Sequence, residues 1–152
     1  MFFAQDDSDQ RHGYHAALSV VASGVHDGEV IVAALLHDIG KRHARLGILG
    51  RSLASVLILS GLPLSERMRA YRDHGLVAAR ELSALGGPPL AIDFAMHHHG
   101  ERPPTIEPGV WDVLIEADQP PRRGKSRFGS QGGSNATDTR KPDNGRITSA
   151  GQ

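Results

Sequence analysis

The sequence predicts an all-α protein, and three observations support this expectation. Apolar residues recur at intervals of three and four along several segments, which is the spacing of one face of an α-helix. No segment shows the sustained alternation of apolar and polar residues that is typical of a half-buried β-strand. Glycine and proline separate the apolar segments at short intervals. We therefore expect a compact bundle of about five to six helices.

The N-terminal part of the chain supplies the first two predicted helices. Residues 9–23 form the first, because apolar residues give it one apolar side, and Gly24 ends it. Asp27 has a side chain suited to the N-cap of the second helix, which runs through residues 30–39. Gly40 follows directly and fits a helix C-terminal stop.

The middle of the chain contains three further helical patterns. Residues 46–60 are apolar and mostly helical in pattern, although two glycines interrupt them. Ser65 follows a Gly-Leu-Pro break and can cap a short helix that runs through Tyr71. Residues 76–85 are periodic in leucine and alanine and are closed by a pair of glycines.

Two more helices are predicted before the composition changes. Pro88 and Pro89 open the first, a position where proline costs little, and Gly100 stops it. A proline-rich loop over residues 101–109 follows. The last helix covers residues 110–118, where apolar residues and a final aspartate fall at helical spacing on one face.

The C-terminal segment, residues 120–152, differs from the rest of the chain. It is rich in Gly, Ser and Thr and has seven Lys or Arg against two Asp or Glu, a net charge of +5. The segment also has very few apolar residues, so it cannot bury enough surface to offset the entropy lost on ordering. We expect residues 9–119 to form one helical domain and residues 120–152 to be a disordered basic tail. The tail lacks the interleaved aromatics of a nucleic-acid-binding arm, so nucleic acid is not an expected partner.

Composition also bears on the compartment and on the chemistry. The 152-residue chain has no apolar run of the roughly 18 residues that a membrane span requires, and its N-terminus lacks the pattern of a signal peptide. It has no cysteine, so disulfides and thiolate metal sites are absent. We expect a cytoplasmic protein with no membrane partner. All nine histidines precede residue 100, which suits metals bound by imidazole and carboxylate.

Histidine and aspartate stand at the ends of several apolar helix faces. His37 and Asp38 end the run from Ala33 to Leu36 on its buried side, where an unpaired carboxylate is costly and needs a cation. Similar residues end the other helical patterns or precede them: His12 or His15, His74, His98 and His99, and Asp118. Facing helices that carry such side chains inward are a common way to build a metal site in a bundle.

In this order the segments resemble the HD-domain superfamily of metal-dependent phosphohydrolases, as a small single-domain member. The resemblance extends over residues 9–119. The matching segments are Asp9-Gln10-Arg11-His12, Ala33-Ala34-Leu35-Leu36-His37-Asp38-Ile39-Gly40-Lys41, Tyr71-Arg72-Asp73-His74, His97-His98-His99 and Glu116-Ala117-Asp118. The segment that ends in Lys41 is the most specific of them.

The resemblance implies a role for each matching residue. A first metal would be held by His12, His37, Asp38 and Asp118. In members with two metals Asp38 bridges, and the second would be held by His74, His98 and His99. His15, one turn from His12, is the alternative first ligand. Lys41 matches a lysine that contacts the phosphate of the substrate, so Asp38 and Lys41 are the expected catalytic residues.

The implied activity is hydrolysis of a phosphate ester or anhydride by metal-activated water. The expected partner is a small phosphorylated substrate, a nucleotide or a related metabolite. The cofactor would be one or two divalent ions, Mn, Fe, Zn or Mg, and the nitrogen and oxygen ligands favour Mn or Fe. Two alternatives stay open: a di-iron oxygenase on the same scaffold, and a non-catalytic module that senses a nucleotide.

Overall fold

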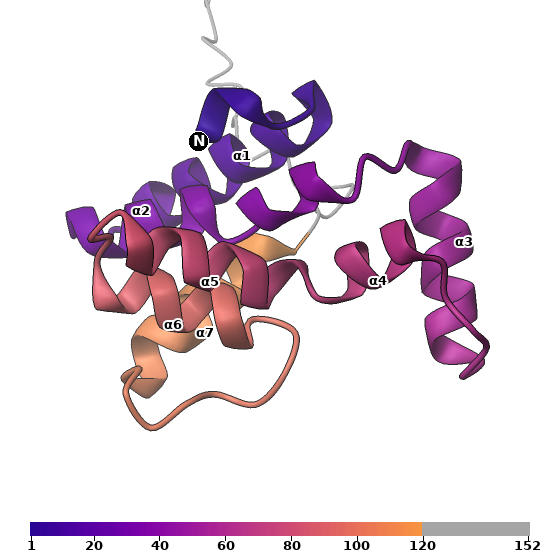
Figure 1. Ribbon diagram of the computed structural model, residues 1–152. Helices are drawn as coiled ribbons and strands as arrows, with labels where there is room; N and C mark the ends of the chain where they lie inside the picture. The colour runs from indigo at the N-terminus through magenta and orange to yellow at the C-terminus, as the bar shows by residue number, and fades with distance from the viewer. Residues whose placement is uncertain (120–152) are drawn as a thin grey trace, which may run out of the picture. The chain divides into compact units, whose positions relative to one another are not determined.

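The computed structural model describes residues 1–119, and the predicted tail of residues 120–152 lies outside them. The described part contains seven α-helices and two short 3₁₀ helices, and no β-strand occurs in it (Figure 1). The all-α class predicted from the sequence is therefore confirmed, although residues 1–119 contain seven α-helices where about five to six were predicted. None of the helices in residues 1–119 is both long and apolar enough to span a bilayer.

The helices follow one another with short connections. In chain order they are η1 (Phe2–Ala4), α1 (Asp7–Ala22), α2 (Gly28–Leu36), η2 (Ile39–His43), α3 (Ile48–Leu59), α4 (Glu66–Arg72), α5 (His74–Ala84), α6 (Pro89–His97) and α7 (Pro108–Asp118). Side-chain caps begin several of them. Asp27 accepts hydrogen bonds from the first turn of α2, and Ser65 accepts one from the backbone N–H of Met68 in α4, as predicted.

Two helix boundaries differ from the prediction in a way that affects the site. Helix α2 ends at Leu36, so His37 and Asp38 lie in a turn between α2 and η2. Gly40 is buried inside η2 and does not end a helix, so the helix-stop interpretation was wrong. His74 is the first residue of α5, whereas the sequence pattern placed it ahead of that helix.

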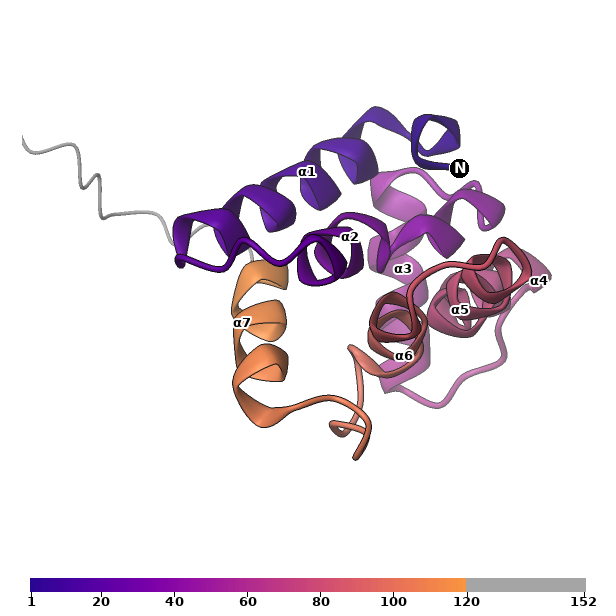
Figure 2. The same ribbon diagram turned by 90° about the vertical axis from the view of Figure 1, so that its left-hand side faces the viewer.

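The hydrophobic core lies among α1, α2, α5, α6 and α7. Its largest fully buried apolar side chains are Val20, Ile39, Phe94, Ile106 and Leu114. Helix α1 packs on α2 and α7, and α5 packs on α6 (Figures 1 and 2). The Phe94 ring is edge-on to Trp111, with centroids 5.7 Å apart, and also contacts the rings of His37 and His98. The core therefore extends directly to two histidines of the predicted site.

A buried ion pair connects α3 to α1. Asp9 is almost fully buried and accepts hydrogen bonds from both terminal nitrogens of Arg51, at 2.5 and 2.7 Å. The arginine Nε also donates to the carbonyl of Leu46. Because both charges are paired in a two-point contact, this buried carboxylate is compensated. The contact positions α3, which otherwise packs against α4 (Figure 1).

Two glycines allow the elements around the site to approach closely. A Cβ atom at Gly75 would lie 2.5 Å from the carbonyl oxygen of Ala95 in α6. A Cβ atom at Gly40 would overlap the carbonyl oxygen of His74 in α5. Since real Cβ atoms do not come so near to backbone oxygen, only glycine fits at either position with this backbone. These contacts bring η2, α5 and α6 together where His74 and His98 are located.

Candidate metal centre

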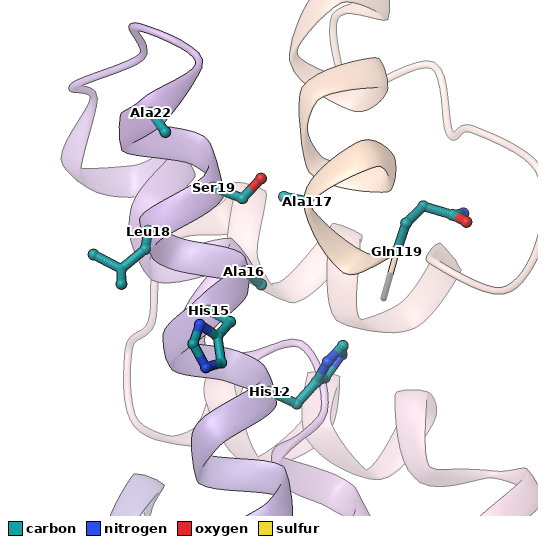
Figure 3. Close-up of a pocket in the computed structure, with 8 residues that line it drawn as sticks. All are labelled: His12, His15, Ala16, Leu18, Ser19, Ala22, Ala117 and Gln119. Atoms are coloured by element: carbon teal, nitrogen blue, oxygen red, sulfur yellow. The ribbon is translucent and has the colours of Figure 1, made fainter. Parts of the chain in front are cut away.

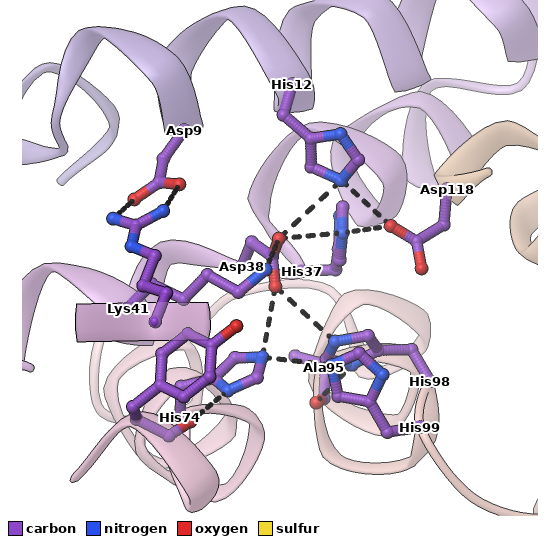
Figure 4. Close-up of polar contacts among 12 residues, drawn as sticks. Asp9, His12, His37, Asp38, Lys41, His74, Ala95, His98, His99 and Asp118 are labelled. Atoms are coloured by element: carbon purple, nitrogen blue, oxygen red, sulfur yellow. Dashed lines mark hydrogen bonds and ion pairs between the residues drawn. The ribbon is translucent and has the colours of Figure 1, made fainter. Parts of the chain in front are cut away.

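The centre is built around the turn that follows α2. His37 and Asp38 are only 1% and 3% exposed, and both side chains point into the bundle (Figure 4). The apolar residues of α2 place this turn against the core, which is why two polar groups are buried here. Five helices, α1, α2, α5, α6 and α7, carry the polar side chains around it or end beside it.

The polar side chains form two groups that share one residue. The first group comprises His12, His37, Asp38 and Asp118, and the second comprises Asp38, His74, His98 and His99. Within each group the ligand atoms all lie within 4.8 Å of one another. Asp38 belongs to both groups, so its carboxylate lies between two sets of imidazole nitrogens (Figure 4).

Each oxygen of Asp38 faces a different group. Its Oδ2 lies 3.4 Å from Nε2 of His37 and 3.6 Å from Nε2 of His12. Its Oδ1 lies 3.1 Å from Nε2 of His74 and 3.5 Å from Nε2 of His98. Asp118 closes the first group, because its Oδ1 lies 2.9 Å from Nε2 of both His12 and His37. The Asp38 carboxylate therefore lies between the two groups, with one oxygen toward each.

Backbone hydrogen bonds fix the orientation of the three buried histidines. Each Nδ1–H donates to the carbonyl three residues earlier: His37 to Ala34 at 2.8 Å, His74 to Tyr71 at 2.5 Å and His98 to Ala95 at 2.9 Å. In the neutral imidazole this leaves the lone pair of Nε2 pointing at the centre. Metal-binding histidines are usually held in this way by their second nitrogen.

With these histidines neutral, buried acceptor atoms at the centre face one another with no hydrogen between them. A neutral His37 would direct the lone pair of Nε2 at Oδ1 of Asp118, with no hydrogen between them. In the second group, Oδ1 of Asp38 and Nε2 of His98 are buried and have no hydrogen-bond partner. Such orphaned acceptors are costly unless a proton or a cation lies between them. The residues present therefore fit divalent metal ions in both groups.

The pKa values of these groups also show that the two carboxylates favour a positive charge between them. Burial alone would lower the pKa of His37, but the carboxylates of Asp38 and Asp118 outweigh it and raise the pKa to about 10. Burial alone would raise the pKa of both carboxyl groups, yet the histidines hold both values below the usual range. Burial and the neighbouring imidazoles lower the pKa of His99 to about 4, so its ring is neutral at pH 7.

Metal binding should therefore release the proton of His37. At pH 7 the metal-free ring carries it, because the pKa is about 10, and an imidazole must lose it to coordinate. We expect about one proton released per chain and a metal affinity that rises up to about tenfold per pH unit between pH 7 and 9. Titration calorimetry with Mn²⁺ in buffers of different ionisation enthalpy measures the proton count. A heat that is the same in every buffer would contradict it.

The structure brings together all seven residues that the resemblance implied as ligands. Of the two candidates on the first helix, His12 lies in the first group, whereas His15 is exposed and belongs to neither. His97 is also outside both groups. The ammonium of Lys41 donates to Oδ2 of Asp38, which places this cation beside the shared carboxylate (Figure 4).

Sequence reasoning missed one aromatic residue at the centre. The ring of Tyr71 stacks on His74, with centroids 5.8 Å apart and planes 29° apart. Its backbone carbonyl also accepts the Nδ1 hydrogen bond of the same histidine. Tyr71 thus restrains His74 in both position and rotation. The separation of three residues was visible in the sequence, but nothing there indicated that a backbone carbonyl would receive the bond.

Comparison with known proteins gives one match. A family model described as HD domain matches residues 13–127, about three quarters of the chain. The match begins directly after His12 and includes the other six residues of the two groups. Neither the curated proteins nor the solved structures contain a match to this chain.

Proposed function

Because the chain belongs to the HD-domain family of metal-dependent phosphohydrolases, we propose that it hydrolyses a phosphate ester or anhydride of a nucleotide or a related metabolite. The observation that supports this most directly is the orientation of His37, His74 and His98. All three direct Nε2 at the same buried carboxylate, Asp38, through backbone hydrogen bonds. Histidines that bind a metal are typically oriented by a hydrogen bond from the second ring nitrogen in this way.

The two groups would hold one ion each. His12, His37 and Asp118 would bind the first and His74, His98 and His99 the second, with Asp38 bridging. A pair of divalent ions activates water for attack and neutralises the oxygens of a phosphoryl group. The donor atoms are nitrogen and oxygen, so Mn²⁺ or Fe²⁺ is favoured over Zn²⁺ and Mg²⁺.

Asp38 and Lys41 have different tasks beside these ions. The lowered pKa of Asp38 keeps its carboxylate charged, which suits a ligand better than a proton acceptor. The Lys41 ammonium pairs with Oδ2 of this carboxylate, and its side chain is 15% exposed. There it would contact the phosphate of the substrate and stabilise the charge that develops on the phosphoryl oxygens.

Metal analysis combined with a substrate screen tests the proposal. We expect the purified protein to contain one or two Mn²⁺ or Fe²⁺ ions per chain, or to bind them when they are added. With metal bound, it should release phosphate from at least one member of a panel of nucleotides, phosphodiesters and sugar phosphates. Protein that takes up no transition metal, or that hydrolyses none of these compounds with Mn²⁺ added, would refute it. Oxygen consumption with bound iron would instead indicate an oxygenase.

The division into two groups predicts separable losses of metal. His99→Ala removes a ligand of the second group only, so we expect the affinity for one of two ions to fall at least about tenfold. His12→Ala should have the same effect on the other ion. Competition with a chelator, followed by metal counting, measures both. His97→Ala is the matched control, since His97 lies in neither group. Identical losses in all three variants would contradict the division.

A further inference from the structure

A cavity of about 290 Å³ lies between α1 and the end of α7. We call it the α1–α7 groove; its lining includes His12, His15 and Ser19 of α1 and Ala117 of α7. In Figure 3 Ser19 and Ala117 face one another across it. The rise of an α-helix places Ser19 about 10 Å along α1 from His12. The groove therefore extends well beyond the metal centre.

The groove begins at the first metal group. His12 belongs both to that group and to the groove lining, and Ala117 directly precedes Asp118. The side chains of His12 and Asp118 are 34% and 22% exposed, whereas that of His37 is 1% exposed. The first group is therefore accessible to solvent at these two residues, of which His12 also lines the groove. A phosphate held at the ions could place the rest of its molecule in this groove.

The lining indicates which chemistry the groove accepts. Among residues 1–119, none of those that line it is Asp, Glu, Lys or Arg. A second phosphate placed there would find no charged partner among these lining residues, and this is costly. Ala16 and Ala117 are 1% and 6% exposed and form an apolar floor. The His15 imidazole can stack on a flat ring, and the Ser19 hydroxyl can donate or accept a hydrogen bond.

We propose that the α1–α7 groove binds the neutral, ring-bearing alcohol of a phosphate monoester, such as the nucleoside of a nucleoside monophosphate. His15 and Ser19 are then residues that determine specificity. This inference rests on the proposed function. In the reaction a water oxygen bonds to phosphorus and the bond from phosphorus to the alcohol oxygen breaks. The alcohol oxygen takes up a proton that originates from the water, so the products are phosphate and the free nucleoside.

Filling the groove should change substrate preference. Ser19→Leu adds a side chain opposite Ala117, so we expect KM for nucleoside monophosphates to rise. The ratio of kcat/KM for these substrates to that for acetyl phosphate, whose leaving group is small, should fall at least about tenfold. His15→Ala should lower the same ratio by about threefold. The matched controls are Ser83→Leu on the exposed side of α5 and His26→Ala in the loop before α2, both outside the groove.

A binding measurement separates this inference from the proposed function. Adenosine alone, added to the metal-free protein, should shift the NMR signals of the Ala16 and Ala117 methyl groups, and Ser19→Leu should reduce the shifts. Wild-type protein that hydrolyses no phosphate compound would overturn the proposed function. Two results would overturn the groove assignment alone. One is a folded, active Ser19→Leu protein whose ratio of kcat/KM values is unchanged. The other is a set of adenosine shifts confined to other helices.

Discussion

Asp38→Asn is expected to abolish both metal positions and to lower kcat/KM at least about a thousandfold. Asp38 is the one residue that both groups share, and each of its oxygens faces different histidines. The amide keeps the size of the side chain but removes its charge and replaces one oxygen by a donor. Bound metal contributes several kcal/mol to transition-state stabilisation, and about 4 kcal/mol corresponds to three powers of ten in rate.

Metal counting and steady-state kinetics on the same preparations measure this effect. Asp112→Asn is the matched control, because Asp112 is exposed on α7 and lies in neither group. It should retain wild-type metal content and activity. If Asp38→Asn instead kept one ion with full affinity, the carboxylate would not bridge. The remaining ion would then identify the group that is complete without it.

The histidines and aspartates that cluster at the centre could be singled out in the sequence because they follow local patterns. Each follows from the end of an apolar helix face or from the entry to a helix, and residues of this kind share one side of a helix by its period. Burial of His37 and Asp38 follows from the apolar α2 sequence before them, and the structure has both almost fully buried. The all-α class follows from the same periodicity.

Which of two nearby histidines faces inward could not be decided in this way. His12 and His15 are three residues apart, so their side chains point only about 60° apart around α1. The choice depends on where α7 packs, and this places Asp118 next to His12 and leaves His15 in the groove. The ion pair of Asp9 with Arg51 joins residues 42 positions apart, and neither side chain shows its partner in the sequence.

The structural role of Gly40 could not be predicted from the sequence either. After an apolar helix, a glycine is typical of a C-terminal stop, and this interpretation requires only local information. Its actual role depends on His74, a residue of another helix whose carbonyl oxygen lies where a Cβ atom would be. Close approach of two backbones is a tertiary property, so no pattern within residues 33–41 could indicate it.

Gly40→Ala is therefore expected to be among the most destabilising single substitutions in this fold. The added methyl group would overlap backbone, not the end of a flexible side chain, so no rotamer change can relieve it. Overpacking of this kind costs about 3 kcal/mol of unfolding free energy. Because the backbone that must shift is that of His74, the affinity of the second metal group should fall as well.

Urea unfolding of the metal-free protein measures the change in the free energy of unfolding without a contribution from bound ions. Gly28→Ala is the matched control, since Gly28 begins α2 and a Cβ atom there would meet nothing within 4 Å. The free energy of unfolding of that variant should be unchanged or up to about 1 kcal/mol higher, because alanine loses less backbone entropy on folding than glycine does. Equal stability of the two variants would mean that η2 and α5 can separate at no cost, and the second metal group would then not depend on their contact.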